Sequence, residues 1–126
     1  MNIFKDKKLL IIDDDVNFCY TLASILYEKG YRVECISTGI KAMQKVKEFM
    51  PDLIILDFLI PGVNGIELCE QIRKDRKTES IPILMISGDD KESVKADSFI
   101  AGADEFLAKP IDTDRFLNSL EEILSS

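Results

Sequence analysis

The sequence predicts an α/β fold in which five parallel strands form a sheet between two layers of helices. Short runs rich in Ile, Leu and Val alternate five times with amphipathic stretches, and three of these runs are apolar nearly throughout, as strands covered on both faces are. With 126 residues, of which 46% are hydrophobic, the chain can bury the core of about one domain. We therefore expect a single domain over residues 1–126, a doubly wound (βα)5 sandwich of three layers with right-handed crossovers.

The elements of this fold follow one another along the chain. The expected strands are residues 8–13, 32–37, 52–57, 82–87 and 105–109. The stretch after the first strand has the i, i+3, i+4, i+7 spacing of a helix, at Cys19, Leu22, Ala23 and Leu26. This helix ends at Gly30, the second stops at Met50-Pro51, and the third begins after Asn64, which is placed to cap it. The fourth, from about residue 91 to 102, has the weakest apolar pattern. The fifth has a clear one, with Phe116, Leu117, Leu120, Ile123 and Leu124 on one face.

Composition excludes several classes of function. The net charge of −7 argues against direct binding to nucleic acid or to anionic membranes, which need a basic face. No apolar run has the length of a membrane span, and the N-terminus lacks the pattern of a secretory signal, so we expect a cytoplasmic protein. The absence of histidine rules out Ser/His/Asp triads and His-ligated zinc. Catalysis would have to use carboxylates, hydroxyls, amines or a hard metal ion.

The three cysteines do not form a disulfide pattern. Cys19, Cys35 and Cys69 are odd in number, far apart in sequence and placed within apolar segments. We interpret them as reduced thiols of the core rather than as a disulfide framework or a zinc site.

Polar residues follow the ends of the predicted strands. They are Asp13 and Asp14 after the first, Asp57 and Ser87 at the ends of the third and fourth, and Lys109 in the fifth. Taken singly, such residues are often helix caps, turn residues or solvated charges. In an open α/β sheet, however, the carboxyl ends of the strands meet at one edge, where ligands bind. Carboxylates clustered there without His or Cys favour Mg²⁺, with Mn²⁺ as an alternative.

These groups would suit the transfer of a phosphoryl group onto Asp57. A carboxylate can attack phosphorus to form an acyl phosphate, and Lys109 and the metal ion would neutralise the phosphoryl oxygens. The Ser87 hydroxyl would donate a hydrogen bond to one of them. The neighbouring Asp15 has a different expected role, because it precedes the first helix at Val16 and could cap its free N–H groups.

Four motifs in register resemble the receiver domain of bacterial two-component response regulators, of the kind found in chemotaxis regulators. They are "IIDDD", "PDLIILDFLIPGVNG", "PILMISG" and "DEFLAKP", and the resemblance covers essentially the whole chain. It implies a flavodoxin-like sheet with the strand order 2-1-3-4-5. It also implies that Asp57 is the phosphoacceptor, and that Asp13, Asp14, Asp57 and the backbone carbonyl of Leu59 hold the metal ion.

The resemblance assigns further roles at the ends of the last two strands. Ser87 takes the family's Ser/Thr switch position, Lys109 is the lysine that pairs with the phosphate, and Phe106 is the aromatic switch. The Lys109-Pro110 bond would be cis, as is typical of the family. Two positions depart from the commoner residues of the family, since Ser87 replaces Thr and Phe106 replaces Tyr. Phe106 therefore has no hydroxyl, and it can equally be an ordinary aromatic residue of the core.

The resemblance implies partners as well. A histidine kinase or a histidine phosphotransfer protein would donate the phosphoryl group, docking on the first helix and the loops around Asp57, where we expect Phe18 and Ile60 to be exposed. Phosphorylation would change the surface of the fourth helix, fifth strand and fifth helix, and an unknown downstream protein or a fused output domain would respond to it. We interpret the basic stretch at residues 73–77 as a solvated helix end rather than a contact with a partner.

Two other functions compete with this one. Haloacid dehalogenase-like phosphatases share an Asp-x-Asp pattern, which Asp13-Asp14-Asp15 provides, but Asn17 stands where their Thr or Val should be and Asp57 is left unexplained. The second alternative is a receiver-like binding module that is not phosphorylated. Such modules usually lack one of the acids, the hydroxyl or the lysine, whereas this chain has all of them.

Overall fold

A computed structural model describes residues 2–60 and 62–126. Met1 lies outside the described residues, and so does Pro61, which belongs to the motif "PDLIILDFLIPGVNG". Strands and helices alternate strictly in this part of the chain. They are β1 (Lys8–Ile12), α1 (Val16–Glu28), β2 (Arg32–Ile36), α2 (Ala42–Phe49), β3 (Leu53–Asp57), α3 (Gly65–Lys74), β4 (Ile83–Ser87), α4 (Glu92–Ala101), β5 (Glu105–Ala108) and α5 (Thr113–Leu124). Each expected strand is present and begins or ends within one residue of the predicted range.

All neighbouring strands of the sheet are parallel, in the order β2-β1-β3-β4-β5, which confirms the predicted fold class. The chain winds outward in both directions from the β1–β3 pair, and this is where such sheets bind ligands. Ile12 is in register with Leu56. The residues that follow them, Asp13 and Asp57, therefore leave two adjacent strands at the same edge.

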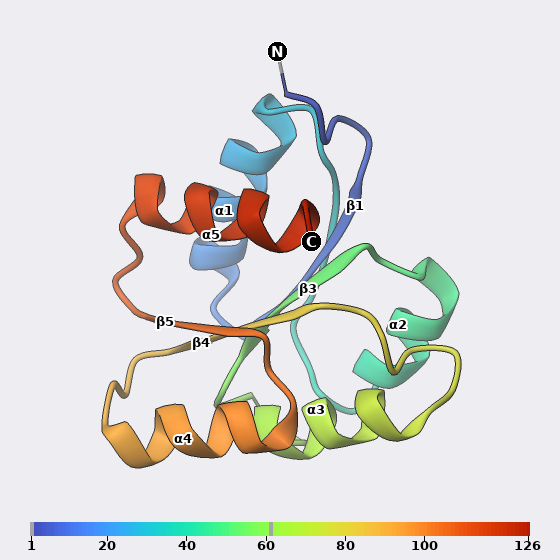
Figure 1. The fold of residues 1–126 in the computed structure, drawn as a ribbon, viewed down its shortest axis with the longest axis vertical. Helices are drawn as coiled ribbons and strands as arrows, with labels where there is room; N and C mark the ends of the chain where they lie inside the picture. The colour runs from blue at the N-terminus through green and yellow to red at the C-terminus, as the bar shows by residue number, and fades with distance from the viewer. Residues whose placement is uncertain (1, 61) are drawn as a thin grey trace.

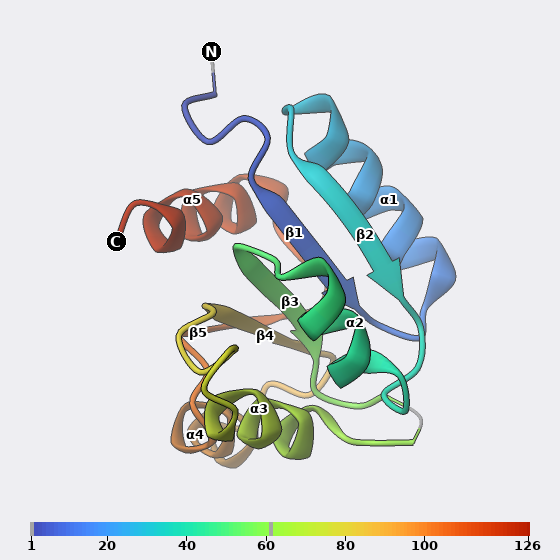
Figure 2. The ribbon, with the colours of Figure 1, turned by 90° about the vertical axis from the view of Figure 1, so that its right-hand side faces the viewer.

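Helices cover both faces of the sheet. Figures 1 and 2 show α1 and α5 on one face and α2, α3 and α4 on the other, each pair of layers enclosing a cluster of buried apolar side chains. Every residue of β3 and β4 is buried, whereas β2 lies at the edge of the sheet and is partly exposed. No helix in the described ranges is long and apolar enough to cross a membrane.

Three of the helix ends follow local chemistry that could be read from the sequence. Asp15 accepts a hydrogen bond from the Phe18 backbone N–H at 3.1 Å and caps α1, as predicted. Asn64 caps α3 in the same way by accepting from the N–H of Glu67 at 2.9 Å. After α1, Gly30 adopts a φ of 96°, a left-handed conformation that suits glycine at a helix C-terminus.

The basic stretch at residues 73–77 differs from the prediction at its first residue. The Arg73 guanidinium donates hydrogen bonds to the backbone carbonyls of Gly102, Glu79 and Ile81 and to the carboxylate of Asp104. A guanidinium has five N–H donors in a rigid plane and can therefore join several loops at once. Arg73 is thus a structural contact between α3 and the loops at the amino ends of β4 and β5, and not part of a solvated helix end.

The cysteines also differ from the prediction in one case. Cys19 and Cys69 are buried, as expected of core thiols, but Cys35 is exposed. Its exposure follows from the position of β2 at the edge of the sheet.

Candidate functional site

The predicted carboxylates come together at the carboxyl edge of the sheet. Asp13, Asp14 and Asp57 each offer a carboxylate oxygen, and these oxygens all lie within 4.8 Å of one another. Asp13 has no exposed surface and Asp57 is only 7% exposed, whereas Asp14 is open to solvent. Three carboxylates this close repel one another unless a cation lies among them.

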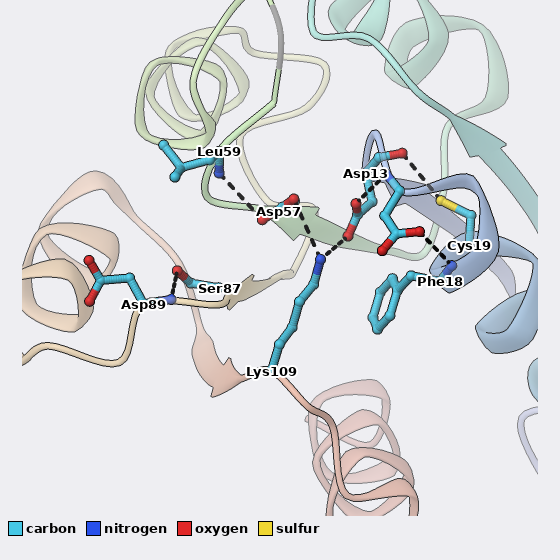
Figure 3. Close-up of polar contacts among 9 residues, drawn as sticks. Asp13, Phe18, Cys19, Asp57, Leu59, Ser87, Asp89 and Lys109 are labelled. Atoms are coloured by element: carbon cyan, nitrogen blue, oxygen red, sulfur yellow. Dashed lines mark hydrogen bonds and ion pairs between the residues drawn. The ribbon is translucent and has the colours of Figure 1, made fainter.

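Lys109 provides a positive charge on one side of this cluster. Its Nζ donates a hydrogen bond to Asp13 Oδ2 at 2.8 Å and lies 3.6 Å from Asp57 Oδ2 (Figure 3). The ammonium also lies over the ring of Phe18, 4.3 Å from its centroid, which adds a cation–π contact. Burial alone would lower the pKa of Lys109, but the hydrogen bond to Asp13 and the charges of Asp57 and Asp13 outweigh burial and raise it. Lys109 therefore stays protonated.

The electrostatics of the site act most strongly on Asp57. Burial, and then the charge of Asp13, raise the pKa of Asp57 to about 6, although Lys109 and the backbone N–H of Leu59 act in the opposite direction. The Leu59 N–H donates to Asp57 Oδ1 at 3.3 Å. Asp57 is thus a carboxylate whose negative charge is only partly compensated in the folded chain.

Three further residues have predicted roles in the switch or the metal site. Ser87 is buried, and its hydroxyl oxygen accepts a hydrogen bond from the Asp89 backbone N–H at 2.9 Å (Figure 3). Phe106 is 5% exposed and packs in the core between the sheet and α2–α4. The side chain of Leu59 points to solvent, and the predicted role of its carbonyl as a metal ligand stays a prediction. The Lys109-Pro110 peptide bond is cis, as the resemblance implied.

The family of the chain follows from a comparison with known protein families. The model of the response regulator receiver domain matches residues 9–121, which is most of the chain. The chain belongs to the response regulator receiver family. It is therefore a signalling domain of two-component systems, and neither its fold nor its family supports the phosphatase alternative.

Relatives of this receiver domain include transcriptional regulators about twice its length and a protein of about the same length. The phosphate regulon transcriptional regulatory protein PhoB of Rhizobium meliloti is 33% identical over 117 residues, which are 93% of this chain and 52% of PhoB. The protein PilH of Pseudomonas aeruginosa is 29% identical over 94% of this chain and 98% of PilH. The chain thus spans about half of the length of relatives such as PhoB and nearly all of PilH.

Solved receiver structures have the same fold. A CheY-like receiver domain protein from Methanospirillum hungatei superimposes with a TM-score of 0.89, at 29% identity over 96% of this chain and 95% of its own. The chemotaxis response regulator CheY4 of Vibrio cholerae gives a TM-score of 0.88 at 27% identity, over 94% of this chain and 99% of its own.

The donor atoms of the receiver site fit a small divalent cation. The group of three side chains offers only carboxylate oxygens, which are the ligands that Mg²⁺ prefers in proteins. Asp14 is exposed, so water can complete the coordination of an ion. Burial and then the charge of Asp13 raise the pKa of Asp57, and a bound cation would act against both by stabilising the ionised carboxylate.

Around the receiver site, sequence reasoning went wrong at two residues and missed one contact. Ile60 was expected to be exposed, but it is only 7% exposed and packs in the core of the α2–α4 face. Phe18 was also expected to be exposed but is half-buried, and nothing in the sequence pattern indicated that its ring would lie beneath the Lys109 ammonium. The signal that could have found it is position, because Phe18 lies in the first turn of α1, directly after the acidic loop.

The repulsion within the site has a measurable effect on stability. Without divalent cations, Asp57→Asn is expected to raise the free energy of unfolding at neutral pH by about 3 kcal/mol, because a neutral amide removes one of the buried charges. The folded chain holds the pKa of Asp57 at about 6, whereas an unfolded chain has a value of about 3.9. The wild type therefore loses stability as the pH rises from about 4 to about 6 and stays at the lower level above that. Urea unfolding of both proteins in EDTA across this range measures the effect, and a difference that does not vary with pH would contradict it.

Proposed function

We propose that Asp57 is the phosphoacceptor of this receiver domain and that a histidine kinase or a histidine phosphotransfer protein donates the phosphoryl group. The observation that carries this proposal is the enclosure of Asp57 at the end of a central strand, where carboxylate oxygens of Asp13 and Asp14 lie within 4.8 Å and the Lys109 ammonium lies at 3.6 Å. Such a group is placed to act as a nucleophile on phosphorus.

The transfer itself needs few groups. A carboxylate oxygen of Asp57 bonds to phosphorus while the phosphorus–nitrogen bond of the donor phosphohistidine breaks, and the leaving nitrogen keeps that electron pair and takes up a proton from water. Lys109 neutralises charge on the phosphoryl oxygens, and the Ser87 hydroxyl, whose oxygen accepts from Asp89, has its hydrogen free to donate to them. Asp13, Asp14, Asp57 and the carbonyl of Leu59 would hold Mg²⁺, or Mn²⁺ in its place. The ion supplies further neutralisation of the phosphoryl charge.

Phosphorylation would then shift the population of two states of the domain. We infer that the added dianion draws Ser87 away from Asp89 and stabilises an inward position of Phe106, whose side chain is buried in this structure. The surface of α4, β5 and α5 changes as a result, with a coupling of about 1–3 kcal/mol. A downstream protein or a fused output domain reads this surface. The domain assists its own phosphorylation and dephosphorylation but is no enzyme toward other substrates.

The docking site of the donor is a further part of the proposal. A cavity of about 430 Å³ lies between α1 and the start of α5, next to Lys109, and Phe18, Ile25, Pro110 and Ile111 are among its lining residues. An apolar hollow that reaches Lys109, whose ammonium lies 3.6 Å from Asp57 Oδ2, suits a helix of the donor that presents its histidine to Asp57. Phe18 therefore keeps its expected place in the docking surface, whereas the buried Ile60 does not.

The proposal also covers where the domain acts and what it does not bind. We infer that residues 1–126 act as one receiver unit in the cytoplasm. We also infer that the unit does not bind nucleic acid or anionic membranes directly, since its net charge is −7.

The three neighbouring acids offer a test of the metal site. Asp14→Asn is expected to weaken Mg²⁺ binding at least about tenfold, since it removes one of the carboxylates that would hold the ion. Asp15→Asn is the matched control, because asparagine still caps α1 and the Asp15 side chain is used for that cap. Calorimetric titration of both variants with Mg²⁺ measures the difference. Equal affinities for the two variants would contradict the assignment.

A further inference from the structure

Cys19 and Cys35 lie on adjoining elements, α1 and the edge strand β2. Cys35 is in register with Ile11, and Ile11 and Cys19 belong to the same buried cluster under α1 and α5. Side chains alternate along a strand, so Cys35 lies on the face of β2 that also carries Val33, and Val33 packs against that cluster. Figure 2 shows α1 running alongside β2. The two cysteines, although separated along the chain, therefore lie on the same face of the sheet, on elements that run side by side.

Each of the two thiols affects the pKa of the other. The interaction between the thiols is the largest influence on the pKa of either residue, and it raises the pKa of Cys19 and lowers that of Cys35. Cys35 is exposed at the edge strand, whereas Cys19 is 6% exposed beneath α1. This arrangement pairs an accessible thiol with a protected one. Cys69 is apart from them, since it is buried in the cluster on the opposite face of the sheet.

We propose that Cys19 and Cys35 form a reversible disulfide when the protein meets hydrogen peroxide. The Cys35 thiolate attacks one peroxide oxygen, giving a sulfenic acid and releasing hydroxide, which becomes water by taking up the proton that the Cys35 thiol lost. The Cys19 sulfur then attacks the Cys35 sulfur, and the hydroxyl group leaves as water with the Cys19 proton. Two thiols lose two electrons in all, peroxide is reduced to two water molecules, and a dithiol reductant reverses the bond.

The disulfide would act on the acidic site through Asp13. The Cys19 thiol donates a hydrogen bond to the backbone carbonyl of Asp13 at 3.3 Å, as Figure 3 shows, and the disulfide has no hydrogen left to donate. The Asp13 carboxylate accepts from Lys109 and from the N–H of Asp15, so movement of its backbone disturbs the cluster. Oxidation therefore weakens Mg²⁺ binding by about threefold to tenfold, the range expected for one lost hydrogen bond. This second step rests on the proposed function, and the disulfide itself does not.

The first experiment tests the bond. The protein is treated with a small excess of hydrogen peroxide, its remaining thiols are alkylated, and peptides are mapped by mass spectrometry without reduction. We expect a linked pair of peptides containing Cys19 and Cys35 in the wild type and in Cys69→Ser, no link in Cys35→Ser, and loss of the link after dithiothreitol. A wild type that remains alkylated at both residues, or is linked through Cys69, would overturn the proposal.

The second experiment tests the effect on the site. Calorimetric titration with Mg²⁺ compares reduced wild type, oxidised wild type and peroxide-treated Cys35→Ser, and we expect weaker binding in the oxidised wild type alone. Equal affinities would overturn the coupling to Asp13. A separate experiment measures phosphoryl uptake by the reduced protein from acetyl phosphate. It distinguishes a failure of the coupling between the disulfide and Asp13 from a failure of the proposed phosphoacceptor function. If the reduced protein takes up no phosphoryl group yet the link forms and Mg²⁺ binding weakens, the inference stands and the phosphoacceptor assignment does not.

Discussion

Incubation with acetyl phosphate and Mg²⁺ is expected to add one phosphoryl group to the wild-type domain and none to Asp57→Asn. Asparagine matches the shape of aspartate but has no anionic oxygen to attack phosphorus, so the acyl phosphate cannot form. Intact-mass spectrometry at neutral pH measures the uptake of the phosphoryl group directly. Omission of Mg²⁺, or its removal with EDTA, is expected to abolish uptake by the wild type, because the clustered carboxylates then repel the incoming phosphate.

Asp15→Asn is the matched control for this experiment. It removes a carboxylate two residues from Asp13 but keeps the cap of α1, and it is expected to take up the phosphoryl group as the wild type does. Urea unfolding shows whether Asp57→Asn is folded, and in the absence of metal it should be more stable than the wild type. An unmodified wild type, or a modified Asp57→Asn, would contradict the assignment of Asp57.

Replacement of Lys109 by methionine is expected to lower the free energy of unfolding of the metal-free domain by about 2 kcal/mol. The ammonium donates to Asp13 at 2.8 Å, and Asp13 has no exposed surface, so the substitution leaves a buried carboxylate without its cation. Breaking a buried ion pair in this way typically costs about 3–5 kcal/mol. We expect a smaller value because the Lys109 side chain is 22% exposed and water screens part of the interaction.

Lys109→Arg serves as the control, since it keeps the positive charge and is expected to lose less than about 1 kcal/mol. Urea unfolding in EDTA measures both variants, and addition of Mg²⁺ should reduce the loss in Lys109→Met, because a bound cation compensates the same carboxylates. The effect has the opposite sign to that of Asp57→Asn. A Lys109→Met domain as stable as the wild type would show that Asp13 is not held by this pair.

Much of the site could be predicted because it depends on the ends of buried strands. Every residue of β3 and β4 is buried, so their hydrophobic runs are uninterrupted and the polar residue that closes each run, Asp57 or Ser87, stands out in the sequence. Parallel strands end at one edge, which brings Asp57 to Asp13 without any knowledge of the loops. The strand order, in contrast, came with the resemblance to receiver domains and not from the periodicity.

The predictions that failed concern exposure and long-range contacts. Cys35 lies in an apolar run, but β2 is an edge strand, and a single sequence does not show which strand lies outermost. Ile60 lies in a loop, yet it folds back into the core. Arg73 belongs to a basic stretch, but its carbonyl partners include Gly102 and Ile81, which only the tertiary fold brings within reach. Hydropathy describes a residue, whereas these outcomes depend on its neighbours in space.

Because Lys109 contacts both Asp13 and Asp57, its positive charge helps to determine which bound ion makes the site electrically neutral. Three ionised carboxylates and one ammonium carry two net negative charges, so a divalent cation makes the site neutral. A potassium or sodium ion would leave one charge uncompensated in a largely buried place, which is costly. Without the lysine, a trivalent ion would match the carboxylates better than Mg²⁺ does. Selectivity by ionic valence is therefore a property of the lysine as much as of the acids.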